Sequence, residues 1–215
     1  MIDPDTFIIT RKRKKYKFAK FANSPICFEL DQWQKTPVDI VEIGAGTGQF
    51  SVELAAQNPD KTYVAVDVKA DRLQKGAYEA TERGLENIYF IRARADQLLE
   101  LFTRESLEGI WVTFPDPFPK QRSAGRRLTH PNFLRIYDSL LVSSGSIYLK
   151  HDNPDFFCWS LEQFVNEKWQ IKELSFDLHE SSLADEYKTK TTYEQRWLDE
   201  GRITQFVRTK RGIIM

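Results

Sequence analysis

Short apolar runs alternate with amphipathic stretches along most of the chain. Val38–Ile43 is an almost continuous apolar run, which is typical of a strand buried on both faces of a sheet. A helical pattern follows it to about Asn58, and the same alternation then repeats. It predicts strands at Thr62–Val66, Ile88–Ile91, Gly109–Phe114 and Ser146–Lys150, and helices at Ala70–Arg83, Gln97–Phe102, Thr129–Leu141 and Pro154–Glu167.

The end of the chain has a different pattern. Gln170–Phe176 and Ile203–Thr209 indicate strands, separated by the polar stretch Asp177–Lys190 and a short helix over Tyr193–Asp199. Strands that alternate with helices predict a mostly parallel sheet with helices on both faces. We therefore expect a Rossmann-like α/β fold, in which a seven-stranded, mostly parallel sheet ends in an antiparallel C-terminal hairpin strand.

Length and charge indicate one domain with a basic extension. The 215 residues fit a basic N-terminal arm over residues 1–22 and a single domain over residues 23–215. The formal net charge is zero, with 31 basic and 31 acidic residues, but residues 11–20 hold seven basic side chains and no acidic one. Such runs of like charge often form interaction tails.

The cysteines and histidines indicate neither a disulfide framework nor a metal site. Cys27 and Cys158 lie far apart, and His130, His151 and His179 lack metal-ligand spacing. No apolar stretch approaches the length needed to span a membrane. We therefore expect a soluble, cytoplasmic protein without a metal, either a monomer or a homodimer.

Glycines at positions 44, 46 and 48 lie between the first strand and the first helix. They allow a sharp turn and close approach of a ligand to a helix N-terminus. A dinucleotide fingerprint would need a third glycine at position 49, which is Gln49. Asp67 ends the second strand, where an acid can accept hydrogen bonds from both hydroxyls of a ribose. Together these features resemble class I S-adenosylmethionine-dependent methyltransferases more than dehydrogenases. In the alternative interpretation, the glycines only turn the chain and Asp67 caps the next helix.

Two further acids fit the same scheme. Asp96 follows the third strand, where a carboxylate could accept a hydrogen bond from an adenine amine, although it fits a helix N-cap equally well. Glu42 at the end of the first strand faces the cofactor or is a satisfied acid at the edge of the sheet.

The segment Phe114–Lys120 is the most specific in the chain. Prolines at alternate positions favour an extended, stiff backbone, which would hold Asp116 at the carboxyl end of the sheet. Lys120, Arg122, Arg126 and Arg127 follow closely, and basic residues beside a binding site suit phosphate contacts.

This segment resembles the Pro-Asp-Pro-Trp-Pro-Lys motif of the bacterial tRNA (guanine-N7-)-methyltransferase family. The resemblance covers most of the chain, because it also takes in the glycine loop, Arg94-Ala95-Asp96 and Thr191-Thr192-Tyr193-Glu194. Phe118 stands where tryptophan is usual, Gln121 and Ser123 interrupt a denser basic run, and Thr192 replaces a basic residue.

The resemblance implies methyl transfer from S-adenosylmethionine to N7 of guanine 46 in the variable loop of tRNA. N7 carries a lone pair and no proton, so no base is needed, but the product is positively charged and a fixed carboxylate would stabilise that charge. Asp116 is thus the expected catalytic residue. The expected cofactor ligands are Glu42, Gly44, Gly46, Gly48, Asp67, Asp96 and Asp116; the expected base-binding residues are Lys120, Asp152, Thr191, Thr192, Tyr193 and Glu194; the expected phosphate contacts are Arg122, Arg126, Arg127, Arg11, Lys12, Arg13, Lys14 and Lys15.

Three alternatives remain open at this point. The chain could methylate another RNA or a small molecule, although the basic arm and the loop around Asp116 argue against a small substrate. It could be a non-catalytic RNA-binding module on the same fold, which failure to bind S-adenosylmethionine would support. A dehydrogenase is the weakest alternative, because of Gln49.

Overall fold

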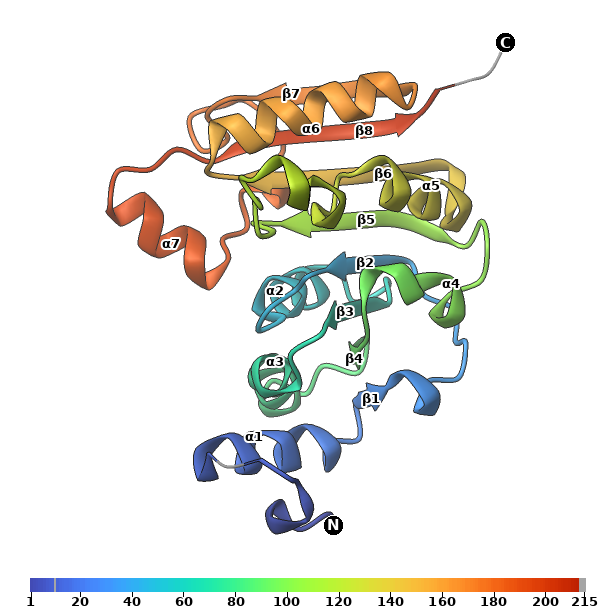
Figure 1. The fold of residues 1–215 in the computed structure, drawn as a ribbon, viewed down its shortest axis with the longest axis vertical. Coiled ribbons are helices and arrows are strands. Elements are labelled where there is room, and N and C mark those ends of the chain that lie inside the picture. Colours follow the sequence, from blue (N-terminus) through green and yellow to red (C-terminus); the bar gives the residue numbers. More distant parts are fainter. Residues whose placement is uncertain (10, 213–215) are drawn as a thin grey trace. The chain divides into compact units, whose positions relative to one another are not determined.

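The chain forms two compact units, residues 1–102 and residues 103–215, each built around four strands (Figure 1). The computed structural model describes residues 1–9 and 11–212. The α/β class and the antiparallel C-terminal pair are confirmed, while the expected count of seven strands is corrected to eight within the described part. The additional strand is β1 (Cys27–Glu29), which at three residues is too short to show a pattern along the sequence.

Unit 1 carries a fully parallel set of strands in the order β1-β4-β3-β2. Its interior strand residues are almost completely buried, as expected for strands covered on both faces. Helices connect β2 to β3 and β3 to β4, so the loops that leave these strands gather at their carboxyl ends. The elements are β2 (Ile40–Ile43), α2 (Gln49–Gln57), β3 (Tyr63–Asp67), α3 (Ala70–Glu82), β4 (Ile88–Arg92) and α4 (Leu98–Leu101).

The basic N-terminal segment folds into a helix. A short 3-10 turn at Pro4–Thr6 precedes α1 (Lys12–Ala22), which contacts α3 and β1. Ala19 and Phe21 are buried on its inner face, while most of its cations remain exposed. The packed inner face gives this charged segment a fixed orientation on unit 1.

Unit 2 combines a parallel and an antiparallel pairing. β5 (Leu107–Thr113) runs parallel to β6 (Leu141–His151), and β8 (Gln205–Arg211) lies antiparallel between β6 and β7 (Trp169–Ser175). Three helices accompany these strands, α5 (Pro131–Leu140), α6 (Pro154–Asn166) and α7 (Thr192–Asp199).

Local sequence signals start each helix of unit 2. α5 and α6 both begin with proline, whose missing N–H costs nothing at that position. The ring of His130 accepts a hydrogen bond from the backbone N–H of Asn132 at 3.2 Å, and the Asn153 side chain accepts one from Phe156 at 2.8 Å. These caps fix where each helix starts after its preceding loop.

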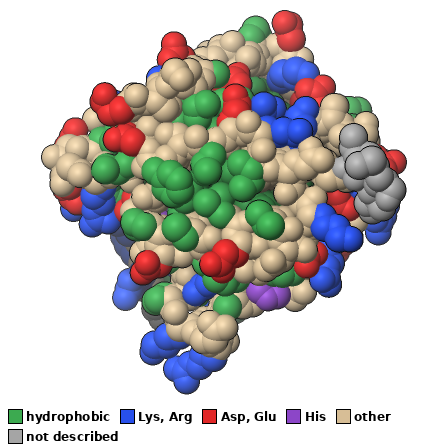
Figure 2. All heavy atoms as spheres, turned by 90° about the horizontal axis from the view of Figure 1, so that it is seen from above, with side chains coloured by type: hydrophobic (Ala, Val, Ile, Leu, Met, Phe, Trp, Pro, Cys, Tyr) green, Lys and Arg blue, Asp and Glu red, His purple; other side chains and the backbone are tan. Residues whose placement is uncertain are grey.

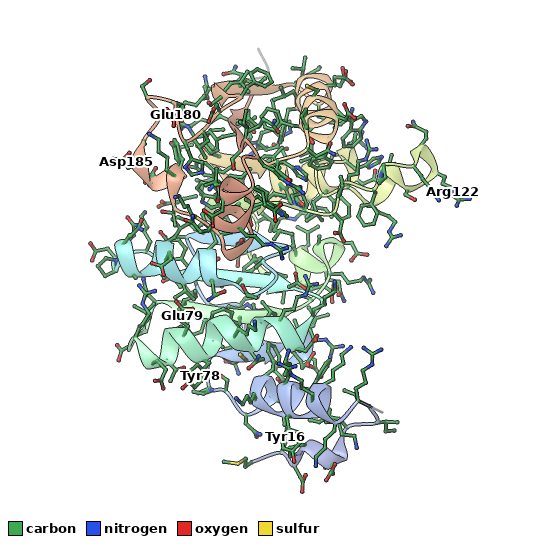
Figure 3. The ribbon with its side chains drawn as sticks, turned by 90° about the vertical axis from the view of Figure 1, so that its left-hand side faces the viewer. Tyr16, Tyr78, Glu79, Arg122, Glu180 and Asp185 are labelled. Carbon is green, nitrogen blue, oxygen red and sulfur yellow. The ribbon has the colours of Figure 1, made fainter. Side chains whose placement is uncertain are left out.

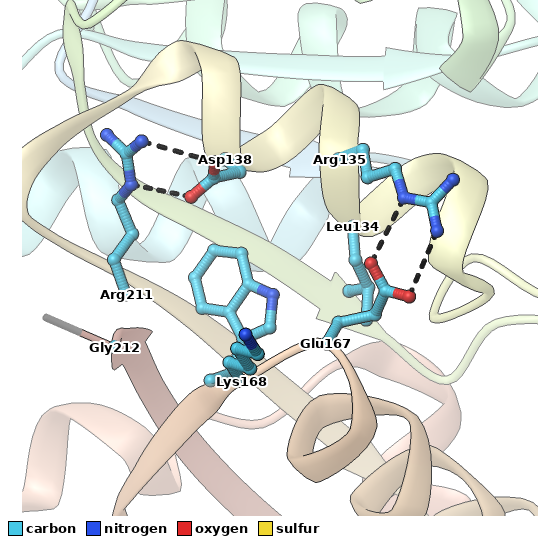
Figure 4. Close-up of a pocket in the computed structure, with 8 residues that line it drawn as sticks. Leu134, Arg135, Asp138, Glu167, Lys168, Arg211 and Gly212 are labelled. Carbon is cyan, nitrogen blue, oxygen red and sulfur yellow. Dashed lines mark hydrogen bonds and ion pairs between the residues drawn. The ribbon is translucent and has the colours of Figure 1, made fainter. Parts of the chain in front are cut away.

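Two arginine–carboxylate pairs tie α5 to the end of α6 and to β8 (Figure 4). Nε of Arg135 lies 3.1 Å from Glu167, and Nε of Arg211 lies 2.5 Å from Asp138. The small hollow between them, about 150 Å³, is lined by these paired charges and by Trp169. We assign it a structural role in joining α5 to the β7–β8 pair.

β7 is the last strand in the order of unit 2, and its outer edge is protected. A bulge lies between Ile171 and Glu173, and Lys172 within it is exposed. Bulges and lysines hinder pairing of an edge with another chain. Apolar side chains gather on the face of the molecule shown in Figure 2, and Val165 and Phe176 are among the exposed apolar residues of this unit.

No helix in residues 1–9 and 11–212 combines the length and the apolar character needed to cross a membrane.

Candidate functional site

The glycine loop of unit 1 needs glycine for its backbone. Gly44, Gly46 and Gly48 have φ values of 71°, 59° and 73°, in the left-handed region that favours glycine. The backbone N–H groups of Gly44 and Ala45 donate to the carbonyl of Val66 at 2.9 and 3.1 Å. The loop is therefore tied to β3 and leads directly into the N-terminus of α2.

Gly76 on α3 completes this loop, although sequence analysis did not single it out. Its N–H donates to the carbonyl oxygen of Thr47 at 3.0 Å. A Cβ atom at Gly76 would lie 2.4 Å from that oxygen and 2.7 Å from the Phe90 ring, and a Cβ at Gly48 would lie 2.6 Å from the same ring. The available signal was a glycine inside an amphipathic helix, where it costs about 1 kcal/mol relative to alanine.

Asp67 at the end of β3 holds the loop from the other side. One carboxylate oxygen accepts a hydrogen bond from Gly46 N at 2.9 Å, and the other accepts one from Lys69 N at 2.8 Å. Burial raises the pKa of Asp67, although these two bonds oppose the shift. Asp67 is not the N-cap of α3, since Lys69 occupies that position. The simple capping alternative is therefore not what the structure shows.

Glu42 and Asp96 differ sharply in their surroundings. Glu42 is buried at the end of β2, and its carboxylate accepts a hydrogen bond from Ser51 on α2 at 2.6 Å. Asp96 is exposed and pairs with Arg94 through two bonds of 2.9 and 3.1 Å, which lower the pKa of its carboxyl. Asp96 is not an N-cap either, because Arg94 and Gln97 hold the caps of the two turns around it.

The loop that carries Asp116 belongs to unit 2 and follows β5. Asp116 itself is exposed. The residues before two of the prolines, Phe114 and Phe118, have φ values of 47° and 38°. The expectation of a uniformly extended segment is therefore wrong at these two positions, where the chain turns through the left-handed region. Such strained conformations persist only where surrounding contacts enforce them.

Two buried side chains supply those contacts. Nε2 of His151 lies 2.9 Å from the carbonyl oxygen of Pro115. On the other side of Asp116, Arg127 donates to the carbonyls of Pro117 and Phe118, each at 3.0 Å. Its guanidinium also lies 4.3 Å from the centre of the Trp159 ring. Arg127 is 7% exposed and its donors already hold the loop, so the structure favours an anchoring role over the predicted phosphate contact.

The other basic residues after the loop remain accessible. Lys120, Arg122 and Arg126 are exposed, on or beside the 3-10 turn Gln121–Arg126. Arg126 lies 4.3 Å from the centre of the Phe118 ring, and Arg122 projects away from the body of its unit in Figure 3. These three fit the predicted phosphate-contacting surface.

The end of β6 supports three different segments through three consecutive residues. Lys150 donates to the carbonyl of Thr189 at 2.9 Å and to Glu194 at 2.7 Å. His151 bonds to the Asp116 loop. Asp152 accepts from Arg202, which follows α7, at 2.9 Å. Sequence analysis assigned no role in the site to Lys150 or His151, because their partners are distant in sequence.

Thr191 and Glu194 form a capping box at the start of α7. The Thr191 hydroxyl accepts from Glu194 N at 2.9 Å, and the Glu194 carboxylate accepts from Thr191 N at 3.1 Å. Glu194 also accepts from His179 at 2.9 Å. Burial alone would raise the pKa of Glu194, but the bond from His179 and the charge of Lys150 outweigh it and lower the pKa.

This geometry changes the expected role of Glu194. Its side chain is completely buried and both of its oxygens are engaged, so the carboxylate orders the start of α7, and direct contact with a base stays a prediction. The predicted contacts of Thr192 and Tyr193 concern side chains that lie outside the part of the chain that the structure describes.

The cations of α1 also divide into two groups. Lys12, Arg13 and Lys14 are exposed, as is Arg11 just before the helix. Lys15 instead pairs with Asp5 at 3.4 Å and is only 25% exposed, which makes it a weaker candidate for a phosphate contact. Within residues 1–9 and 11–212, no three histidine, cysteine or acidic side chains could hold a metal ion together.

Comparison with known proteins agrees with this reading of the fold. Residues 36–206 match a family model described as "Putative methyltransferase". A solved structure of the 16S rRNA methyltransferase KamB has a TM-score of 0.61 at 15% identity, over 85% of this chain and 90% of that one. This likeness concerns the fold alone, and it is that of the class I methyltransferases.

Relatives with similar sequences show which family of methyltransferases the chain resembles. A tRNA (guanine-N(7)-)-methyltransferase of Brevibacillus brevis is 35% identical over 191 residues, which cover 86% of this chain and 88% of the relative. One of Cytophaga hutchinsonii is 39% identical over 165 residues, 75% of each chain. The chain belongs to the tRNA (guanine-N(7)-)-methyltransferase family.

Proposed function

We propose that this protein transfers the methyl group of S-adenosylmethionine to N7 of guanine 46 in the variable loop of tRNA. The observation that carries the proposal is the exposed Asp116, held by two anchored carbonyls in a chain that belongs to this family. The nearest alternatives are methylation of a different base and RNA binding without catalysis.

The residues of unit 1 fit S-adenosylmethionine. The glycine loop leads into the N-terminus of α2, where the positive end of the helix dipole suits a carboxylate. Asp67 accepts one backbone hydrogen bond at each oxygen, and a carboxylate has about four acceptor positions, so it can also accept from ribose hydroxyls. Glu42, near the end of β2, and Asp96, in the turn that follows β4, complete the proposed site. When bound, the cofactor supplies an electrophilic methyl group on a sulfonium.

The residues of unit 2 fit the guanine. Attack by N7 needs no deprotonation, and it leaves positive charge on the purine. A carboxylate held in place before the reaction stabilises that charge without reorganising, which is often the largest catalytic effect. Asp116 provides this carboxylate, and we propose that it also contacts the cofactor. Lys120 and Asp152 contact the base or its neighbouring nucleotide, while Thr191 and Glu194 order the segment that carries Thr192 and Tyr193.

Exposed cations in both units fit the tRNA backbone. Lys120, Arg122 and Arg126 in unit 2 and the α1 cations in unit 1 would neutralise phosphates. Such contacts add affinity without reading sequence, so guanine selection falls to the residues around Asp116.

Nucleoside analysis tests the proposal directly. The purified protein is incubated with S-adenosylmethionine and unmodified tRNA, and digested nucleosides are separated by mass spectrometry. We expect 7-methylguanosine, and nuclease mapping should place it at position 46. Another methylated nucleoside would replace this substrate assignment. Failure to bind S-adenosylmethionine would favour a non-catalytic RNA-binding protein.

Asp116→Asn removes the charge and keeps the shape of the side chain. We expect kcat to fall by about 10²–10³-fold, the usual loss when one electrostatic group of this kind is removed. Affinity for tRNA should change little, and circular dichroism should confirm folding. Turnover close to that of the natural protein would contradict the role of Asp116.

A further inference from the structure

We propose that His151 and Arg127 are positioning residues for Asp116, and that they act by anchoring the peptide carbonyls on either side of it. The inference rests on the proposed function, because it concerns the same loop. Pro115 O and Pro117 O flank Asp116 along the chain, and each accepts a hydrogen bond from one of these two buried side chains.

The hydrogen bonds of His151 determine the state of its ring. The Pro115 carbonyl can only accept, so Nε2, at 2.9 Å, carries the proton. The backbone N–H of Asn153 can only donate, so Nδ1, at 2.8 Å, carries a lone pair. The ring is therefore the neutral tautomer with its proton on Nε2, which is the form that can hold the loop.

The surroundings of the ring agree with a neutral state. Burial lowers the pKa of His151, while the Pro115 carbonyl and the nearby Asp152 partly oppose this. The charge of Asp152 is shared with Arg202, whose guanidinium lies 2.9 Å from it. Protonation at Nδ1 would remove the acceptor for Asn153, the residue that caps α6.

Arg127 anchors the second half of the loop. Its planar guanidinium places two donors in a fixed fork, which matches the successive carbonyls of Pro117 and Phe118. Its face lies over Trp159 of α6, 4.3 Å from the ring centre. A lysine has a single ammonium group on a flexible stem and cannot reproduce the fork and the stacked plane together.

The anchors have a catalytic consequence because the loop is strained. Phe114 and Phe118 have positive φ values at both ends of the segment, and without the anchors the chain would relax to other conformations. Asp116 would then populate several positions. Electrostatic stabilisation of a developing charge depends on a group that is already in place, so this loss should appear in kcat.

Two substitutions at position 151 separate the anchor from general packing. The amide nitrogen of glutamine reaches about as far as Nε2 of histidine, so His151→Gln can still donate to Pro115. The shorter asparagine reaches only about as far as Nδ1, so His151→Asn loses that bond. We expect kcat to fall by about 10²-fold in the asparagine variant, with KM for tRNA and affinity for S-adenosylmethionine nearly unchanged. The glutamine variant should recover most of kcat.

His130→Asn is the matched control. His130 accepts a backbone hydrogen bond at the N-cap of α5, and asparagine is itself a good N-cap residue. This variant should keep its kcat. For the second anchor, Arg127→Lys should lower kcat, while Arg135→Lys on the exposed side of α5 should not.

Two measurements do not depend on activity. Nitrogen NMR of labelled histidine should show His151 with its proton on Nε2 at neutral pH. Hydrogen exchange at the backbone N–H groups of Phe114, Asp116 and Phe118 should be faster in His151→Asn than in His151→Gln. If the asparagine variant does not fold, the NMR tautomer and the glutamine variant decide the question.

The outcomes separate this inference from the proposed function. The positioning role would be overturned if a folded His151→Asn variant kept the kcat of the natural protein, or if the asparagine and glutamine variants lost kcat equally. It would also be overturned if NMR showed the His151 proton on Nδ1. A natural protein that makes no 7-methylguanosine would instead overturn the proposed function, and loop exchange and the tautomer would still test the anchors.

Discussion

Gly76 has an ordinary helical backbone, so the need for glycine at this position comes from the atoms that lie close to it. A methyl group there would press on the carbonyl of Thr47 and on the Phe90 ring. We predict that Gly76→Ala weakens S-adenosylmethionine binding, because overpacking of about 1–3 kcal/mol would displace the glycine loop. Calorimetric titration measures the effect.

Gly125→Ala serves as the control for Gly76, since nothing lies within 4 Å of the added methyl group. It should bind the cofactor normally. Equal affinities of the two variants for S-adenosylmethionine would show that the glycine loop accommodates the added methyl group. Glycine at position 76 would then not be required for the site.

The site residues that sequence could predict are those that depend on position along one strand. Asp67 and Asp116 follow directly from where strands end, since carboxyl ends of strands bind ligands in this fold. The role of Arg127 could not be predicted, because a basic side chain near exposed cations looks the same whether it faces solvent or its own backbone. The partners of Glu194 could not be predicted for a similar reason: Lys150 and His179 reach it from distant segments.

Helix α1 carries an exposed, mostly basic stripe of side chains. Lys12, Arg13, Tyr16 and Lys20 are exposed and recur at helical spacing, and Figure 3 labels Tyr16 on this helix. Lys12→Gln combined with Arg13→Gln should weaken tRNA binding. The slope of log affinity against log salt should also become shallower by about 2, one for each lost phosphate contact.

Lys172→Gln on β7 is the control for charge loss, because this lysine is exposed on an edge strand of unit 2. Filter binding at several salt concentrations compares the variants. If the slope of log affinity against log salt were the same for the α1 variant and the natural protein, Lys12 and Arg13 would not contact phosphates.

Elements with regular patterns were predicted well, and those without were not. The starts of α5 and α6 lie close to the predicted ones because proline and a capping residue mark both helices. β6 begins earlier than predicted, at Leu141, because Ser143, Ser144 and Gly145 suggest a turn. They form instead an irregular part of the strand, where the pairing with β5 shifts register.

At the scale of the whole molecule, the two units should respond to acid in opposite directions. In unit 2, the pKa values of His151 and Glu194 are lowered from 6.5 and 4.5. The unfolded chain therefore binds more protons, and stability falls as pH drops below about 6.5. In unit 1, the pKa of Asp67 is raised from 3.8, so its contribution improves as pH falls. The exposed pair of Arg94 and Asp96 is screened by solvent, so it adds little to the pH dependence of unit 1.

Hydrogen exchange measured from pH 7.5 to 5, and corrected for the intrinsic rate, resolves the units. We predict that protection in β6 and α7 declines before protection in β2 and β3. An equal decline in both units, or an earlier loss in unit 1, would contradict this assignment of the titrating groups.

The division into two units left no trace in the sequence pattern. Strands and helices alternate without interruption across residue 102, so periodicity alone cannot indicate a boundary there. The predicted arm over residues 1–22 and single domain over residues 23–215 remain predictions.

Anyone who wished to graft the proposed guanine-binding surface onto another scaffold would have to move the end of β6 and the residue that follows it together with that surface. Lys150, His151 and Asp152 hold the start of α7, the Asp116 loop and the segment after α7 in turn. Transplanting any one of these segments alone would leave it without its support, so the smallest portable unit is the strand end with all three attached.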